Sequence, residues 1–170
     1  MKKVLISIVA LAAIVLLPGR VSAQVENTVA SVDVVPLISI TEVNPLNFGR
    51  VNSGSSEGTV TVTTANARTI TGGVTLFGND QTTASYSVLG NASSTYAITV
   101  PTSSINVTKD GVNLAVSGFQ ALSTSTSSGT GGTLNSGGTD SFVVGATLTL
   151  PSGTLPGRYA GTFDVSVAYN

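Results

Sequence analysis

The sequence predicts an all-β protein of antiparallel strands, and three observations lead to this class. Thr, Val, Ser and Gly dominate the chain after residue 23, and no apolar stripe with helical spacing is sustained. Short segments in which apolar and polar residues alternate recur along the chain, separated by residues that favour turns. The last twelve residues, 159–170, alternate most regularly, with apolar side chains mostly at odd positions. Many short strands of this kind are typical of a sandwich or a barrel.

Four further segments show the same alternation, Val74–Phe77 adds a short apolar run, and all five are predicted as strands. They are Thr59–Thr64, Val74–Phe77, Ser85–Leu89, Thr95–Val100 and Phe142–Leu150. Residues 123–138, in contrast, are almost entirely Ser, Thr, Gly and Asn. This composition predicts a long surface loop of low complexity between two strands.

Asp110 and Gly111 predict a tight hairpin, because both central residues of such a two-residue turn need positive φ. With the turn at this position, three residues of the strand before it lie directly opposite three residues of the strand after it. The predicted pairs are Lys109–Val112, Val107–Leu114 and Ile105–Val116. The apolar residues of both strands then share one face of the hairpin.

The first 23 residues predict a cleaved secretion signal. The chain begins with two lysines at positions 2 and 3, continues with an apolar run over 4–17, and reaches small residues at 22 and 23. The apolar run is shorter than the roughly 18 residues that a membrane-spanning helix needs. We therefore expect export through the inner membrane, cleavage after Ala23, and no membrane insertion of the mature chain.

Composition restricts the function further. After cleavage four basic residues remain against eight acidic ones, a formal charge of −4, and no basic patch is present, which argues against nucleic acid as a partner. The chain has no Cys and no His, so it lacks disulfides, thiolate or imidazole ligands, and a His-based catalytic triad. The acidic residues are scattered singly. We expect no enzyme activity, no metal and no cofactor.

Several short motifs, in their order along the chain, carry a resemblance to a known family. The first are Leu46–Val51, which reads LNFGRV, then Gly54 and Gly58–Val62. The later ones are Gly72–Val74, Tyr96–Pro101, Leu148–Gly153 and Pro156–Phe163. This series resembles a bacterial secreted domain family of unknown function, and it covers most of the mature chain.

That family is in turn similar to the pilin-like subunits of chaperone–usher fimbriae. Tyr169, the penultimate residue, matches the ending of such subunits, whereas the missing Cys pair departs from many of them. The resemblance implies a single immunoglobulin-like antiparallel β-sandwich of Greek-key type over residues 37–170. It also implies self-association into fibres at the cell surface, with a periplasmic chaperone and an outer-membrane usher as partners.

The segment 24–36 has two interpretations. As an N-terminal extension, it completes a neighbour's sheet through Ala30, Val32 and Val34, a case of strand addition to an exposed edge. Alternatively, residues 28–43 form the first strand of a complete sandwich, with Pro36 at an edge or a bend. On the first interpretation, the acceptor is the C-terminal strand, whose apolar stripe is Phe163, Val165, Val167 and Tyr169.

The sequence therefore predicts a non-enzymatic structural or adhesive protein, a pilin-like fibre subunit located outside the cell or in the periplasm. The alternative is a self-contained secreted or surface binding module, for which carbohydrate is a candidate ligand. The segment 24–36 distinguishes the two classes, since it is free in a fibre subunit and packed on its own domain in a self-contained module.

Overall fold

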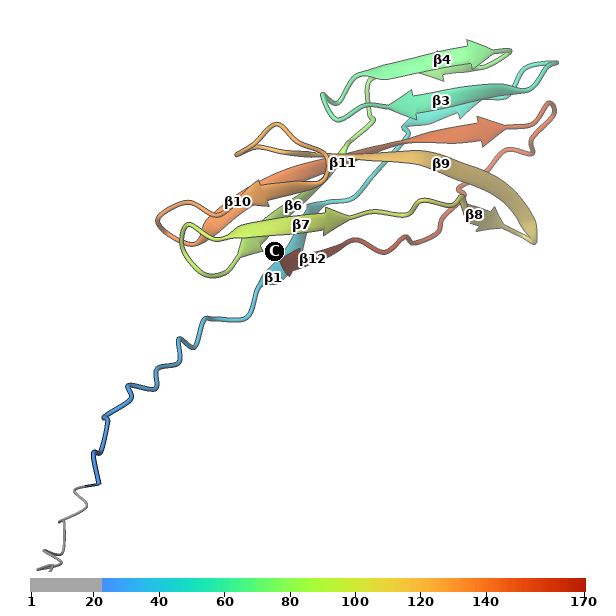
Figure 1. Ribbon diagram of the computed structural model, residues 1–170. Helices are drawn as coiled ribbons and strands as arrows, with labels where there is room; N and C mark the ends of the chain where they lie inside the picture. Colours follow the sequence, from blue (N-terminus) through green and yellow to red (C-terminus); the bar gives the residue numbers. More distant parts are fainter. Residues whose placement is uncertain (1–22) are drawn as a thin grey trace, which may run out of the picture. The chain divides into compact units, whose positions relative to one another are not determined.

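The computed structural model of the chain describes residues 23–170, and in this range it contains β-strands and turns but no helix (Figure 1). Residues 34–170 form one compact unit. The predicted signal peptide lies outside the described residues, apart from Ala23. The strands are β1 (Ser39–Asn44), β2 (Arg50–Asn52), β3 (Gly58–Val62), β4 (Arg68–Gly72), β5 (Thr75–Phe77), β6 (Ala84–Leu89), β7 (Thr95–Thr99), β8 (Ile105–Lys109), β9 (Val112–Ser123), β10 (Gly131–Thr133), β11 (Thr139–Leu150) and β12 (Ser166–Tyr169).

The larger sheet has seven antiparallel strands arranged around β11. One edge of β11 pairs with β6 along its first half and with β3 along its second half, and its other edge pairs with β9. β1 extends the sheet beyond β6, β4 extends it beyond β3, and β8 extends it beyond β9. Neighbours in this sheet are mostly distant in sequence, as in a Greek-key arrangement.

A second layer covers this sheet. The three-stranded sheet β10-β7-β12 places Tyr96 and Ile98 of β7 against side chains of β6, β9 and β11 in one apolar cluster. The two-stranded sheet β2-β5 contributes Val51 and Leu76 to a second cluster, around Val60 and Leu148. The predicted all-β antiparallel sandwich is confirmed.

Alternation explains why these segments form strands. Along β3, Val60 and Val62 are fully buried, while Thr59 and Thr61, which alternate with them, are only half-buried. The hairpin prediction is confirmed in its register, because β8 pairs with β9 through all three predicted residue pairs. At its turn, Asp110 has a φ of 49° and Gly111 a φ of 82°, as a two-residue turn requires.

The prediction for residues 123–138 is wrong in part. The segment contains β10, which pairs with β7, and Leu134 is only 1% exposed. The sequence signal for this burial was Leu134 itself, a single apolar residue in a polar run. Burying Leu134 gives the segment a fixed place on the domain, so it is more than a surface loop.

A carboxylate under this segment also holds it. Asp140 Oδ2 accepts hydrogen bonds from the Tyr96 hydroxyl (2.8 Å), Ser123 Oγ (3.2 Å) and Ser125 Oγ (2.6 Å). Tyr96 and Ser123 are almost completely buried. Burial, and then the hydrogen bond to Asp140, raise the pKa of Tyr96 above its ordinary value. Gly132 passes over this group so closely that a Cβ there would lie 2.5 Å from the carboxylate.

Both ends of the sandwich differ from the predicted strand limits. The final strand was predicted over 159–170, but β12 covers only Ser166–Tyr169, and Ala160 makes a single bridge to Thr108. The predicted alternation of half-buried and exposed residues nevertheless holds from Phe163 to Tyr169, although Gly161 is exposed. At the other end, residues 23–38 contain no strand and β1 begins at Ser39, rather than near residue 28.

Candidate strand-addition site

The outer edges of the two sheets lie next to each other at β1 and β12 (Figure 1). Within the described residues, β1 pairs only with β6 and β12 pairs only with β7. Each strand therefore has one edge without a strand partner in this part of the chain. We call the region between them the seam, with residues 38–44 on one side and 161–169 on the other.

Apolar side chains form the floor of the seam. Six half-buried residues pack from its two sides against the apolar cluster around Tyr96 and Phe142: Ile38, Ile40, Phe163, Val165, Val167 and Tyr169. The last four are the predicted acceptor stripe, and the structure brings them together. The contribution of Ile38 and Ile40 was missed, because it depends on which strand of the other sheet lies opposite the C terminus.

The backbone along part of the seam lacks strand partners. Residues 161–165 belong to no ladder or bridge of the described chain. Pairing between β12 and β7 stops at Ser166 and Thr99, and continuing that register would set Asp164 opposite Pro101. Proline has no N–H to donate, so the ladder ends at this point.

The opposite edge of the three-stranded sheet is covered. Thr126 Oγ1 donates to the Gly131 carbonyl (2.7 Å), and the Thr133 N–H donates to Ser125 Oγ (2.9 Å). Hydroxyls of the Ser/Thr-rich segment thus bind main-chain groups of β10 where a further strand would pair. Covered edges resist strand addition, whereas open ones permit it. In this sheet the open edge is that of β12.

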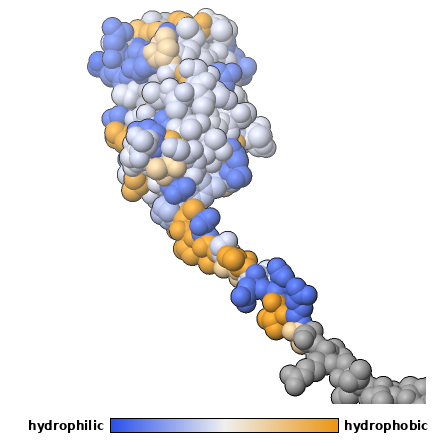
Figure 2. Space-filling view, turned by 60° about the vertical axis from the view of Figure 1, so that its left-hand side comes forward, coloured by the Kyte–Doolittle hydropathy of each residue, from blue (hydrophilic) through white to orange (hydrophobic). Residues whose placement is uncertain are grey.

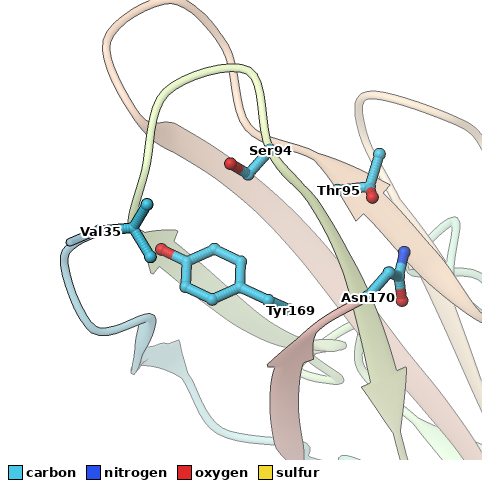
Figure 3. Close-up of a pocket in the computed structure, with 5 residues that line it drawn as sticks. All are labelled: Val35, Ser94, Thr95, Tyr169 and Asn170. Carbon is cyan, nitrogen blue, oxygen red and sulfur yellow. The ribbon is translucent and has the colours of Figure 1, made fainter. Parts of the chain in front are cut away.

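Tyr169 closes one end of the seam. Its hydroxyl donates to the Pro36 carbonyl (2.9 Å) and accepts from the Asn91 N–H (2.6 Å). The ring lies over Gly90, where a Cβ would come within 2.4 Å of the hydroxyl oxygen. Beside it is an open pocket lined by Val35, Ser94, Thr95, Tyr169 and Asn170 (Figure 3).

The predicted donor residues are exposed and lie outside every strand. Val32 is 84% exposed, Val34 is 90% exposed, and Ala30 is exposed too. Figure 2 shows apolar residues interspersed along this part of the chain, while most of the visible domain surface has the pale shade of Ser, Thr and Gly. Such a segment has apolar side chains available for a partner.

A separate polar cluster explains the LNFGRV motif. The guanidinium of Arg68, with its side chain only 2% exposed, donates to the Phe48 carbonyl (3.0 Å) and lies 3.7 Å from Asp80. Arg50 Nε donates to the same carboxylate (3.0 Å). The hydrogen bond from the Arg50 backbone lowers the pKa of Asp80. Gly49, with a φ of 73°, leaves room for the Arg68 guanidinium.

The seam offers main-chain hydrogen bonds and apolar contact. Among residues 23–170, no cluster of three or more potential metal-binding side chains occurs. The same range includes no helix with the length and apolar character required to cross a membrane.

Near the seam, burial, and then the charge of Glu42, raise the pKa of Tyr86 to about 12.

The domain defined by this fold and seam matches one family over residues 38–169, described as a domain of unknown function (DUF4402). The chain belongs to this family. Searches of curated proteins and of solved structures gave no significant match.

Proposed function

We propose that this protein is an exported structural subunit that assembles into a surface fibre, with the extension of one copy bound in the seam of the next. One observation carries the proposal. Two sheet edges without strand partners lie next to each other over half-buried apolar side chains, in a chain whose apolar N-terminal segment is exposed. A strand added in trans would satisfy the backbone and cover the apolar floor together.

Side-chain parity supports Ala30, Val32 and Val34 as the inserted face. In an extended strand these residues point to one side, and Ser31 and Asp33 point to the other. Burying each valine contributes roughly 1.5–3 kcal/mol. The predicted signal peptide and the resemblance to fimbrial subunits favour export and a role in adhesion, with a periplasmic chaperone and an outer-membrane usher as partners.

The test compares two charge substitutions in the mature chain, residues 24–170. Val32→Asp puts a carboxylate on the predicted inserted face, and we expect it to abolish multimers while the domain stays folded. Val29→Asp is the matched control, because Val29 is equally exposed but has the opposite parity. Oligomer size is measured by light scattering after gel filtration, and folding by far-UV circular dichroism.

A third protein lacks residues 24–36. If the proposal is correct, a synthetic peptide of residues 24–36 binds it and raises its melting temperature, and the Val32→Asp peptide does not. If instead the mature chain stays monomeric at high concentration and the truncated chain unfolds, the segment belongs to its own sandwich. The self-contained binding module would then be the better hypothesis.

A further inference from the structure

We propose that Tyr169 is a latch that directs the extension toward another copy and away from the seam of its own domain. This inference rests on the proposed function and concerns the same site. An apolar extension that precedes β1 in the chain could fold back into the seam of its own domain, and a chain closed in this way could not join a fibre. The contacts around Tyr169 act against that closure.

The first step of the argument is the path of the chain before β1. Val35 borders a pocket together with Ser94 and Thr95, at the start of β7, and with Tyr169 at the end of β12 (Figure 3). β7 pairs with one edge of β12, and the open edge of β12 lies toward β1. The close-up places Val35 at the hydroxyl end of the Tyr169 ring, on the side of β12 away from β7, so the chain enters β1 past the end of β12 on the side of the seam (Figure 3).

The second step is that the position of the chain at this entry is fixed by hydrogen bonds. The Tyr169 hydroxyl donates to the Pro36 carbonyl (2.9 Å) and is itself held by the Asn91 N–H (2.6 Å). Pro36 also restricts its own φ and the conformation of Val35. To close in cis, the chain would have to reverse direction immediately before Ile38. That reversal moves Pro36 and breaks its bond to the hydroxyl.

The test measures cis and trans occupancy of the seam directly. The natural chain has no cysteine, so Ser31→Cys and Ser166→Cys supply the only two thiols. Both side chains are exposed and alternate with the apolar positions. A short bis-maleimide joins them within one chain when closure is in cis, and it joins different chains into a ladder when closure is in trans. A denaturing gel separates the two products.

Tyr169→Phe removes only the hydroxyl, and we expect it to raise the ratio of cis to trans product roughly fivefold, the effect of losing one such hydrogen bond. Gly90→Ala provides a second route, since its methyl displaces the hydroxyl while the tyrosine remains. Tyr159→Phe is the control, because its hydroxyl binds the Leu155 carbonyl elsewhere (3.0 Å).

The outcomes separate the two ideas. A raised cis fraction in Tyr169→Phe and Gly90→Ala, but not in Tyr159→Phe, supports the latch. If trans ladders form and the ratio of cis to trans product is the same in all variants, the latch is wrong, but the proposed fibre subunit is still supported. If no protein gives either product, the seam does not bind the extension, and both the proposed function and the latch are wrong.

Discussion

Replacing Asp140 by alanine should destabilise the domain more than the loss of any single surface carboxylate would. Its Oδ2 atom accepts three hydrogen bonds, from the hydroxyls of Tyr96, Ser123 and Ser125. Asp140→Ala removes the acceptor and leaves all three donors in place. Two of them, on Tyr96 and Ser123, are almost completely buried, so water cannot easily replace the lost partner.

The expected magnitude follows from these two buried hydroxyls. Leaving a buried polar group without a partner costs about 1–3 kcal/mol, so losing the partner of both hydroxyls in Asp140→Ala should cost about 2–6 kcal/mol. Tyr96→Phe removes one donor and leaves the carboxylate with its two serines, which should cost about 1 kcal/mol. Because these residues contact each other, the double mutant should cost less than the sum of the two single mutants.

Urea unfolding of residues 24–170, followed by far-UV circular dichroism, measures these free energies. Protein concentrations are chosen so that the midpoint does not depend on concentration, which keeps assembly out of the measurement. Asp164→Ala is the control, because this side chain is exposed and should change stability by no more than about 0.5 kcal/mol. If Asp140→Ala costs as little as the control, Asp140 does not hold the Ser/Thr-rich segment.

Three other predictions concern the core and its charges. Gly49→Ala should destabilise the domain by more than Gly111→Ala when both are measured by urea unfolding, because both glycines have positive φ but only the Gly49 methyl would meet close neighbours. Stability should fall as pH rises from 10 toward 12, because unfolded Tyr86 ionises there while burial keeps the folded form neutral; Tyr86→Phe should weaken the fall. The hydrogen bond from the Arg50 backbone lowers the pKa of the Asp80 carboxyl in the folded protein. Ionised Asp80 should therefore stabilise the fold above the unfolded pKa of 3.8, and this stability should be lost as pH falls through the lower folded pKa. A melting series in acid checks this, and a flat series would contradict it.

Much of the fold could be predicted because the required information is local. The period-2 pattern shows which side chains face inward in β3, β7 and β11, and Asp110-Gly111 specifies a turn whose register follows by counting. The apolar stripe of Phe163, Val165, Val167 and Tyr169 was also predicted in this way. Its side chains point to one face even where the backbone has no ladder partner.

What could not be predicted depends on contacts between distant segments. β12 begins only at Ser166, because continuing its register with β7 would set Asp164 opposite Pro101, which has no N–H to donate. Periodicity contains no information about that neighbour. The order inside residues 123–138 comes from Asp140 and from the burial of Leu134. A Ser/Thr-rich composition alone does not distinguish a free loop from one whose hydroxyls are bound.

The sequence by itself determined the all-β class, the inward faces of the strands, the β8–β9 hairpin and the absence of disulfides, since each follows from neighbouring residues or from composition. Only the tertiary structure decided that β1 and β12 meet as adjacent open edges, that hydroxyls of the Ser/Thr-rich segment cover the outer edge of β10, and that Tyr169 reaches Pro36. The physical reason is that an edge is open or closed according to which strands pair around it. Pairing between strands far apart in sequence, such as β3 with β11, is set by the packing of the whole core.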